Sequence, residues 1–168
     1  MDLRVQKLTA KDFKMIYDLH FDDLRRYLTF RSGDQDLSGD IAQNVFMKVW
    51  TKKIKLEKGS VKSLLFKMAT DDFISHLRRE KLKNQYTESL DLRWNQEVEA
   101  DEDLEDKKIR LQKALNQLSE KQKTALLMNK MQGLTHKEIA EILNLSEKAI
   151  EKRIRLALEN LKQNLKVS

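Results

Sequence analysis

The sequence predicts an all-α protein in which two small helical domains are joined by a flexible acidic linker. Turn-forming residues are scarce, because the 168 residues include four Gly and no Pro, whereas a β-sandwich or a β-barrel needs many turns. Apolar residues recur at the spacing of helix faces. Helix-start patterns, in which Ser or Thr is followed three residues later by an acid or Gln, precede several of these stretches. These observations argue against an all-β fold.

Charge divides the chain into three segments. Residues 1–86 carry a net charge of +6, residues 87–106 carry −8, and residues 107–168 carry +8. The acidic segment is predicted to be a linker extended by its own repulsion. It is either a plain solvated spacer or an acidic docking strip that mimics nucleic acid, with Leu92 and Trp94 as apolar anchors. The predicted boundaries are residues 1–84 for the first domain, 85–107 for the linker and 108–168 for the second domain.

The first domain is predicted to contain three helices that share one core. Thr9 and Asp12 form a capping box that begins the first helix, and a turn at residues 32–34 follows it. The second helix spans about residues 37–53, and Ser60 begins the third. The apolar residues expected at helical spacing are Phe13, Ile16, Tyr17, Phe21, Leu24, Tyr27 and Leu28, then Ile41, Ala42, Val45, Val49 and Trp50, then Val61, Leu64, Leu65, Met68, Ala69, Phe73 and Leu77.

The second helix also carries a polar face. Asp40, Gln43 and Asn44 lie away from its apolar stripe, beside Phe46 and Met47. An acid and two amides on one helix face suit a protein partner better than DNA. The alternative is a solvated helix face.

The third helix ends in a basic segment. Arg78, Arg79 and Lys81 lie near the aromatic residues Phe66 and Phe73, a combination that suits binding to a nucleic-acid backbone with stacking on bases. The alternative is that the two Phe residues belong to the core and that the basic side chains complement the helix dipole.

The second domain is predicted to contain four helices. The first ends near Leu118, and a capping box of Ser119 and Gln122 begins the next, which Gly133 breaks. A further capping box of Thr135 and Glu138 begins the third, and Asn144-Leu145-Ser146 is the turn before the last. The apolar residues expected to pack are Leu111, Leu115, Leu118, Ala125, Leu126 and Met128, then Ile139, Ala140, Ile142 and Leu143, then Ile150, Ile154, Ala157, Leu158, Leu161 and Leu165.

Residues 135–155 have the pattern of a helix-turn-helix. Its last helix fits the major groove of DNA, where base edges carry the sequence code, and Ser146 at the helix start suits a phosphate. A carboxylate on this face either accepts a hydrogen bond from a cytosine amine or pairs with a neighbouring cation. The alternative is a pair of packed helices with a solvated charged side. The outward residues are Glu147, Lys148, Glu151, Lys152 and Arg155.

Several functions are disfavoured by composition. The absence of Cys removes disulfides and thiolate zinc sites, no Gly-rich phosphate loop is present, and His20, His76 and His136 are widely spaced. We therefore predict no catalytic residue, no metal and no cofactor. With no apolar run of membrane length and no signal-peptide core, we expect a cytoplasmic protein without membrane insertion.

Taken together, residues 20–84 and 110–165 resemble the extracytoplasmic-function (ECF) sigma factors of bacterial RNA polymerase. Any one motif is weak, but their order and spacing make the combination specific. The motifs that carry the resemblance are Asp40, Gln43, Phe46 and Trp50, the segments 64–69 and 73–79, the segment 118–123 in place of the family's Leu-Pro start, and the segment 133–143 before the recognition helix.

The resemblance implies an alternative sigma factor that directs promoter-specific transcription initiation, with core RNA polymerase (β′ coiled coil and β subunit), promoter DNA and an anti-sigma factor as partners. The linker would lie in the path of nascent RNA. The implied core-polymerase residues are Asp40, Gln43, Asn44 and Met47. The implied residues for the promoter −10 element are Lys62, Lys67, His76, Arg78, Arg79 and Lys81. The implied residues for the −35 element are Ser146, Glu147, Lys148, Glu151, Lys152, Arg153 and Arg155.

The sequence departs from the family at four positions. Asp71 stands where the family often has Asn, Asn44 where an acid is more usual, Ser119 where Pro is common, and Glu151 where Lys is frequent. The carboxylate of Asp71 would repel phosphates, so no base-reading role is assigned to it.

Two alternatives from other classes remain at this point. A LuxR-type helix-turn-helix regulator shares residues 134–140 and a similar last helix, but it has no reason to carry the segment from Asp40 to Trp50. A helical adaptor without a DNA role would show little salt dependence toward duplex DNA.

Overall fold

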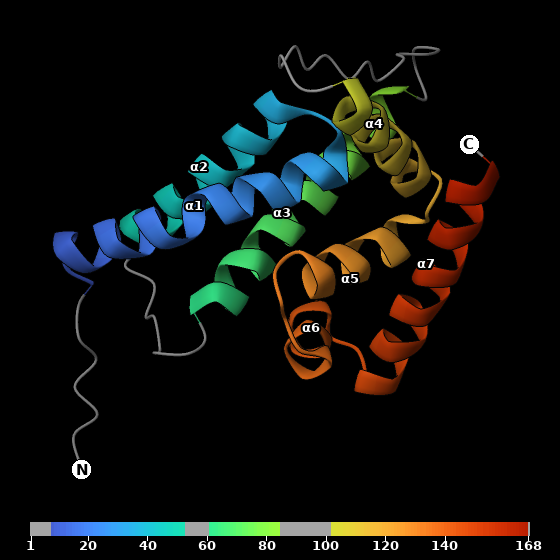
Figure 1. Cartoon of the computed structure of the whole chain (residues 1–168). Helices are drawn as coiled ribbons and strands as arrows, with labels where there is room; N and C mark the ends of the chain where they lie inside the picture. The colour runs from blue at the N-terminus through green and yellow to red at the C-terminus, as the bar shows by residue number, and fades with distance from the viewer. Residues whose placement is uncertain (1–7, 53–60, 85–101, 168) are drawn as a thin grey trace. The chain divides into compact units, whose positions relative to one another are not determined.

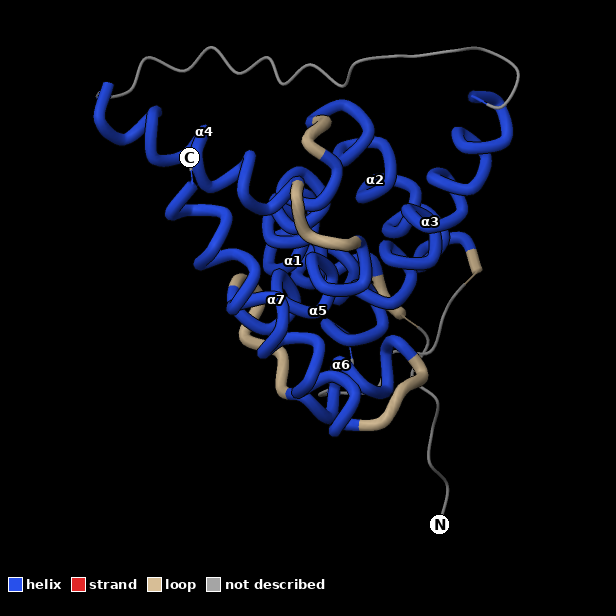
Figure 2. Tube along the Cα trace, turned by 90° about the vertical axis from the view of Figure 1, so that its right-hand side faces the viewer, coloured by secondary structure: helices blue, strands red, loops and turns tan. Residues whose placement is uncertain are grey.

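The computed structural model describes residues 8–52, 61–84 and 102–167, which form seven α-helices and no strand (Figures 1 and 2). The all-α prediction is therefore confirmed. None of the described helices combines the length and the apolar character needed to cross a bilayer. The helices are α1 (Ala10–Ser32), α2 (Gln35–Thr51), α3 (Val61–Asn84), α4 (Glu102–Asn116), α5 (Glu120–Lys130), α6 (His136–Leu143) and α7 (Glu147–Val167).

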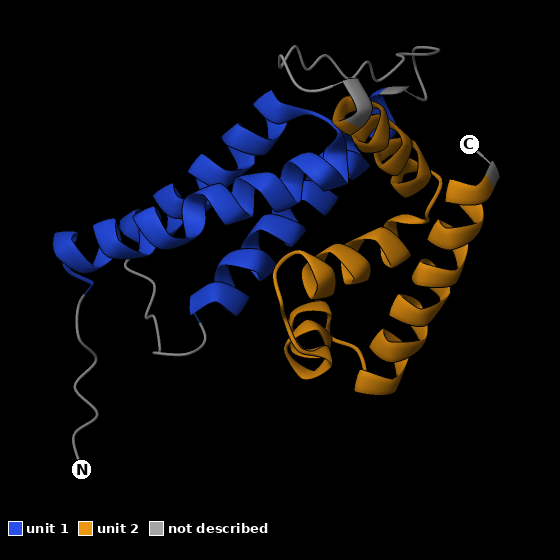
Figure 3. Cartoon of the chain, viewed as in Figure 1, with its two compact units in different colours: residues 1–91 blue, residues 92–168 orange. Residues whose placement is uncertain are grey.

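The chain divides into two compact units (Figure 3). Unit 1 comprises residues 1–91 with α1, α2 and α3, and unit 2 comprises residues 92–168 with α4 to α7. The division falls inside the predicted linker. Residues 85–101, with Leu92 and Trp94, lie outside the described residues, as do Ser60 and Lys53 at the predicted ends of two helices.

Local sequence explains where α1 begins and ends and where α2 begins. The Thr9 hydroxyl accepts from the Asp12 N–H (3.1 Å), and the Asp12 carboxylate accepts from the Thr9 N–H (3.3 Å), so the predicted capping box is formed. Gly33 ends α1 in a left-handed conformation with φ 74°, which Gly adopts without steric cost. The Asp34 carboxylate then accepts from the Leu37 N–H (2.9 Å), so α2 begins at Gln35, earlier than expected.

The core of unit 1 forms where the three helices meet. Phe46 was expected beside the polar face of α2, but it is 2% exposed and lies 5.0 Å from the Tyr17 ring of α1. Conversely, Trp50 was expected in the apolar stripe but is 45% exposed, because it lies at the edge of that stripe on α2. Leu77, also expected in the core, is exposed near the end of α3. The buried apolar residues of unit 1 are Leu24, Tyr27, Leu28, Ile41, Ala42, Val45, Phe46, Val49, Leu65, Phe66, Ala69 and Phe73.

The first helix of unit 2 begins inside the segment predicted to be linker. α4 starts at Glu102, because acidic residues are favoured in the first turn of a helix by its dipole. Lys108 also pairs with Glu105 one turn before it, at 3.6 Å. The acidic run at residues 101–106 therefore favours the start of a helix as well as an extended spacer.

The remaining helices of unit 2 follow their predicted caps with one difference. The Ser119 hydroxyl accepts from the Gln122 N–H (3.3 Å), but the Gln122 side-chain oxygen accepts from Asn160 of α7 (3.4 Å). Ser119 thus caps α5, while Gln122 links α5 to α7. The capping box of Thr135 and Glu138 is formed at the start of α6.

The core of unit 2 lies between α7 and the helices before it. Leu158 was expected on the apolar side of α7 but is 41% exposed, because it lies about 80° around the helix from Ile150. The buried apolar residues of unit 2 are Ala114, Leu115, Leu118, Ala125, Leu126, Leu127, Met128, Leu134, Ile139, Ala140, Ile142, Ile150, Ile154 and Ala157.

Candidate partner and nucleic-acid surfaces

The predicted partner-binding residues of α2 lie on one exposed side. Successive helix residues are about 100° apart, so Asp40, Gln43, Asn44 and Met47 fall within a sector of about 100°. All four are exposed, and the Asp40 carboxylate forms no ion pair with a described residue. This α2 sector therefore offers a carboxylate, two amides and a thioether to a partner.

Trp50 extends the α2 sector at the end of the helix. Its ring centroid lies 5.0 Å from that of Phe13 on α1, so a large, half-exposed aromatic side chain is held in place before any partner arrives. Orienting a side chain in advance reduces the entropy lost on binding.

The predicted −10 residues do not share one side of α3. Lys67 and Arg78 are exposed on the side turned away from the core, and Arg79 and Lys81 are exposed on its flanks. His76 lies instead on the line of the buried residues, where its side chain is partly covered.

Lys62 also lies on the core-facing line of α3. Its Nζ is 6.0 Å from the ring centroid of Phe66, and its charge acts on His20 of α1. Burial lowers the pKa of His20, the positive charge of Lys62 lowers that pKa further, and the carboxylate of Asp23 acts in the opposite direction. Lys62 is therefore separated from Arg78, although both were predicted for the same DNA element.

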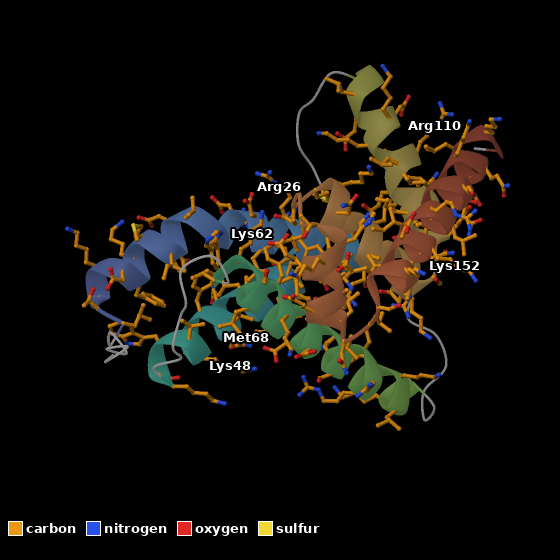
Figure 4. All side chains as sticks on the ribbon, turned by 90° about the horizontal axis from the view of Figure 1, so that it is seen from below. Arg26, Lys48, Lys62, Met68, Arg110 and Lys152 are labelled. Carbon is orange, nitrogen blue, oxygen red and sulfur yellow. The ribbon has the colours of Figure 1, made fainter. Side chains whose placement is uncertain are left out.

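Two adjacent carboxylates on α3 have different surroundings. Asp71 is exposed and forms no ion pair with a described residue. Asp72 is partly buried, and Lys48 of α2 donates to both of its carboxylate oxygens, at 2.6 and 2.7 Å. Figure 4 labels Lys48 on α2 and Met68, one turn before Asp72, on α3.

The helix-turn-helix is formed by α6 and α7. Asn144 ends α6 with φ 53°, a left-handed conformation that Asn tolerates better than most residues. The Ser146 hydroxyl oxygen accepts from the Ala149 N–H (3.2 Å) and caps α7. The short turn predicted at residues 144–146 is therefore confirmed.

Most of the predicted −35 residues gather on one side of α7. Glu147, Lys148, Glu151, Lys152 and Arg155 are all exposed, and they fall in one sector of the helix. Figure 4 labels Lys152 on this helix. We call these five residues the α7 face.

Arg153 is separated from the α7 face. It is partly buried and lies about 170° around the helix from the centre of that face. The structure therefore does not bring Arg153 together with the other predicted −35 residues.

The ion pairs of α7 show whether the two carboxylates of the α7 face are paired with neighbouring cations. Arg155 pairs with Glu159 one turn later, at 3.4 Å. Neither Glu147 nor Glu151 forms an ion pair with any described residue. Of the two interpretations of these carboxylates, pairing with a neighbouring cation is therefore not observed, and both remain available as hydrogen-bond acceptors.

The far end of α7 is fixed by hydrogen bonds to α4. The Asn164 amide donates to the Ala114 carbonyl (3.1 Å), and an Arg110 guanidinium nitrogen donates to the Leu165 carbonyl (3.3 Å). With the link from Asn160 to Gln122, these contacts hold the C-terminal part of α7 against α4 and α5.

Sequence reasoning missed the polar residues that join α3 to its neighbours. Besides Lys48, the buried Arg31 of α1 donates to the Tyr27 hydroxyl (3.1 Å), which lies 3.3 Å from the Thr70 hydroxyl of α3. The Arg31 guanidinium also lies 4.5 Å from the ring centroid of Phe73. The one sequence signal was the position of Arg31, four residues after Tyr27 on an apolar stripe. Among the described residues, no cluster of three or more His, Asp or Glu side chains is arranged to hold a metal.

Comparison with known proteins supplies two family matches. The family model described as Sigma-70 region 2 matches residues 16–83, and the one described as Sigma-70 region 4 matches residues 108–161. The region 2 match includes the α2 sector and nearly all of α3, and the region 4 match includes the α7 face.

Curated relatives resemble the chain over most of its length. The ECF RNA polymerase sigma factor RpoE of Cereibacter sphaeroides is 31% identical over 132 residues, which cover 75% of this chain and 71% of the relative. The ferric citrate uptake sigma factor FecI of Escherichia coli is 27% identical over 163 residues, covering 95% and 94%. Sigma factor SigZ of Bacillus subtilis is 25% identical over 151 residues, covering 89% and 85%.

A solved structure is also similar. It is the sigma factor RpoE of Bartonella quintana in complex with the anti-sigma factor NepR, with a TM-score of 0.80 and 28% identity, covering 95% of this chain and 99% of that one. The region 2 match decides against the LuxR-type alternative, because that class needs only the helix-turn-helix.

Proposed function

This chain belongs to the extracytoplasmic-function family of RNA polymerase sigma factors, and we propose which of its surfaces carry each part of that function. It directs promoter-specific transcription initiation as a subunit of RNA polymerase, so core polymerase and promoter DNA are its partners. Sigma factors are initiation factors without chemistry of their own. We therefore infer that the chain contributes no catalytic residue, and that it works in the cytoplasm, where promoter DNA is found.

The α2 sector is the proposed surface for core polymerase, with the β′ coiled coil as the partner element. The observation that carries this assignment is that Asp40, Gln43, Asn44 and Met47 share one exposed sector beside the held Trp50 ring. A helix-turn-helix regulator that acts without polymerase has no use for such a sector. The β subunit completes the proposed polymerase contacts.

α3 is the proposed contact with the −10 element. Lys67, Arg78, Arg79 and Lys81 are exposed cations suited to phosphates. Lys62 and His76 lie nearer the aromatic core, where they suit an unstacked base or the strand that leads to it. This division explains why the six residues do not share one side of the helix.

The α7 face is the proposed contact with the −35 element. Lys148, Lys152 and Arg155 suit phosphates. The carboxylates of Glu147 and Glu151, which form no ion pair with a described residue, suit cytosine amines in the major groove. Ser146 lies at the N-terminus of the helix, where a phosphate is favoured. We leave Arg153 outside this contact, because its side chain lies on another side of α7.

Regulation by an anti-sigma factor is also proposed. A similar sigma factor was solved in complex with the anti-sigma factor NepR, and most of the present chain aligns with it. The prediction that the acidic segment lies in the path of nascent RNA concerns residues outside those described.

Binding to core polymerase tests the α2 sector. Met47→Ala is expected to weaken the affinity of the full chain for core polymerase by about tenfold, as truncation of a central interface residue does. The matched control is Met15→Ala, since Met15 is 62% exposed on α1 and Met47 is 60% exposed on α2. Equal affinities for the two variants would remove the α2 sector from the interface.

In vitro transcription tests the function as a whole. The full chain with bacterial core polymerase is expected to give discrete transcripts from fragmented genomic DNA, and their start sites define both promoter elements. Absence of promoter-specific transcripts would reject the sigma-factor function. A binding curve for duplex DNA that does not respond to salt would favour the helical adaptor instead.

A further inference from the structure

We propose that Lys48 is a positioning residue for the −10 contact: it holds and neutralises Asp72, so that the DNA-facing part of α3 keeps its positive charge. This inference rests on the proposed function of α3. Lys48 belongs to neither the α2 sector nor the predicted −10 residues.

The geometry of the pair supports a specific role. Lys48 Nζ donates to both carboxylate oxygens of Asp72, at 2.6 and 2.7 Å, and thereby joins α2 to α3. The Asp72 side chain is 26% exposed and that of Lys48 is 41% exposed. The pair is thus partly screened from water, which strengthens it relative to a fully exposed pair.

The position of Asp72 on α3 explains why the pair would affect DNA binding. Asp72 lies on the edge of the buried side, and Arg79 lies two turns further along nearly the same edge, about 10 Å away along the helix axis. That distance is close to the Debye length in 0.1 M salt. A carboxylate released from Lys48 would therefore oppose the attraction between Arg79 and a phosphate.

Asp71 provides an internal comparison. It is the neighbouring carboxylate on the same helix, but it is exposed and has no ion pair with a described residue. The effect of neutralising Asp71 should therefore not depend on Lys48. The effect of neutralising Asp72 should depend on it strongly.

The same pair links two proposed contacts. Lys48 directly follows Met47 of the α2 sector, and Asp72 directly follows Asp71 on α3. A side chain beside the polymerase-binding surface thus sets the charge of the DNA-binding helix, with no need to touch DNA itself.

The test uses holoenzyme formed from core polymerase and the full chain, with forked DNA that carries the −10 element identified by in vitro transcription. At about 0.1 M salt, Lys48→Met is expected to weaken DNA binding about threefold to fivefold, as one added charge at this distance does. Asp72→Asn alone should stay within about twofold of the wild type, because the freed Lys48 side chain, already 41% exposed, extends into water where its charge is screened. The Lys48→Met/Asp72→Asn double variant should stay within the same range. The loss of DNA affinity caused by Lys48→Met should become smaller as the salt concentration is raised.

Two results would overturn the inference. If the double variant binds as weakly as Lys48→Met, Lys48 contacts DNA or polymerase directly. The second result concerns Asp72→Asn. If this change raises the affinity for DNA equally in the wild type and in the Lys48→Met background, the charges of Lys48 and Asp72 act independently. Such an equal effect is expected only of the control, Asp71→Asn. Melting curves of each variant exclude loss of folding as the cause, and affinity for core polymerase should be unchanged by Lys48→Met. Failure of the wild-type holoenzyme to bind would instead count against the proposed function.

Discussion

The two helices proposed to contact promoter DNA, α3 and α7, arrange their charges in different ways. On α7, five of the predicted residues share one exposed side, and the apolar side is turned to the core. On α3, the cations lie on several sides, and Lys62 and His76 lie on the line of the buried residues. Three carboxylates, those of Asp71, Asp72 and Glu80, interrupt the series of cations. A helix that docks in a groove needs one face, whereas a helix that guides separated strands is served by charges around it.

The difference has a structural basis. α7 is held by side-chain hydrogen bonds to α4 and α5 on the side away from its exposed face. α3 is held by Arg31 of α1 and Lys48 of α2, through Tyr27 and Asp72. On α3 these polar contacts engage Thr70 and Asp72, in the middle of the helix. On α7 they lie away from the α7 face and leave it open. Four measurements test this comparison, from the largest expected effect to the smallest.

The largest effect is expected from Phe66 of α3, which belongs to the core of unit 1 and also lies beside Lys62, a proposed −10 residue. Phe66 is fully buried, so Phe66→Ala should lower the free energy of unfolding of unit 1 by about 3–5 kcal/mol. It should also weaken binding to the −10 element, because Lys62 lies against the Phe66 ring. Urea denaturation followed by Trp50 fluorescence in a Trp94→Phe background reports unit 1 alone.

The neighbouring residue supplies the control for that measurement. Lys67 is exposed, so Lys67→Ala should change stability by no more than about 0.5 kcal/mol. If the two variants unfold at the same urea concentration, the buried line of α3 is wrongly assigned.

A smaller effect is expected from a carboxylate of the α7 face. Glu151→Ala should remove about 1–3 kcal/mol of discrimination at one base pair of the −35 element, because an acceptor for a cytosine amine is lost. Competition binding with single-base variants of the element measures this change. Glu159→Ala is the control, since Glu159 is paired with Arg155, and retained discrimination in Glu151→Ala would mean that Glu151 reads no base.

Single cations should have effects of about 1 kcal/mol that depend on salt. Lys152→Ala and Arg78→Ala should each weaken promoter binding and reduce the slope of log K against log salt by about one. Arg153→Ala should leave the slope unchanged, because Arg153 lies off the α7 face. A slope reduced equally by Arg153→Ala and Lys152→Ala would contradict the one-sided arrangement of α7.

Much of unit 2 was predictable from sequence because its signals are local. Caps such as Thr135 with Glu138, and the left-handed Asn144, act within a few residues, and the apolar period of α7 identifies its outward side. The predictions that failed concern positions at the edge of a stripe. Leu158 and Trp50 are exposed and Phe46 is buried, since burial there depends on which neighbouring helix lies alongside.

The site in unit 1 was less predictable because its links join distant positions. Lys48 and Asp72 are 24 residues apart, and Tyr27 and Thr70 are 43 apart, so no helical period reveals them. Sequence also gave no reason to separate Lys62 from Arg78, which differ only in whether their side of α3 meets α1. The start of α4 within the acidic segment was missed because acidic residues favour both a spacer and a helix N-terminus.

The smallest effect is expected from His20, where α1 meets the start of α3. Burial and the charge of Lys62 lower the pKa of His20 in the folded chain from its ordinary value of 6.5, although Asp23 acts the other way. The unfolded chain therefore binds the proton more tightly, so stability should be full above pH 6.5 and should fall as the pH drops from 6.5 through the folded-state pKa. Because the ring is half-exposed, water limits the size of the change. Unfolding of unit 1 measured by Trp50 fluorescence between pH 7.5 and 5 should show this loss, and His20→Gln should remove that part of it. A pH dependence that is identical with and without His20 would place the titrating group elsewhere in unit 1.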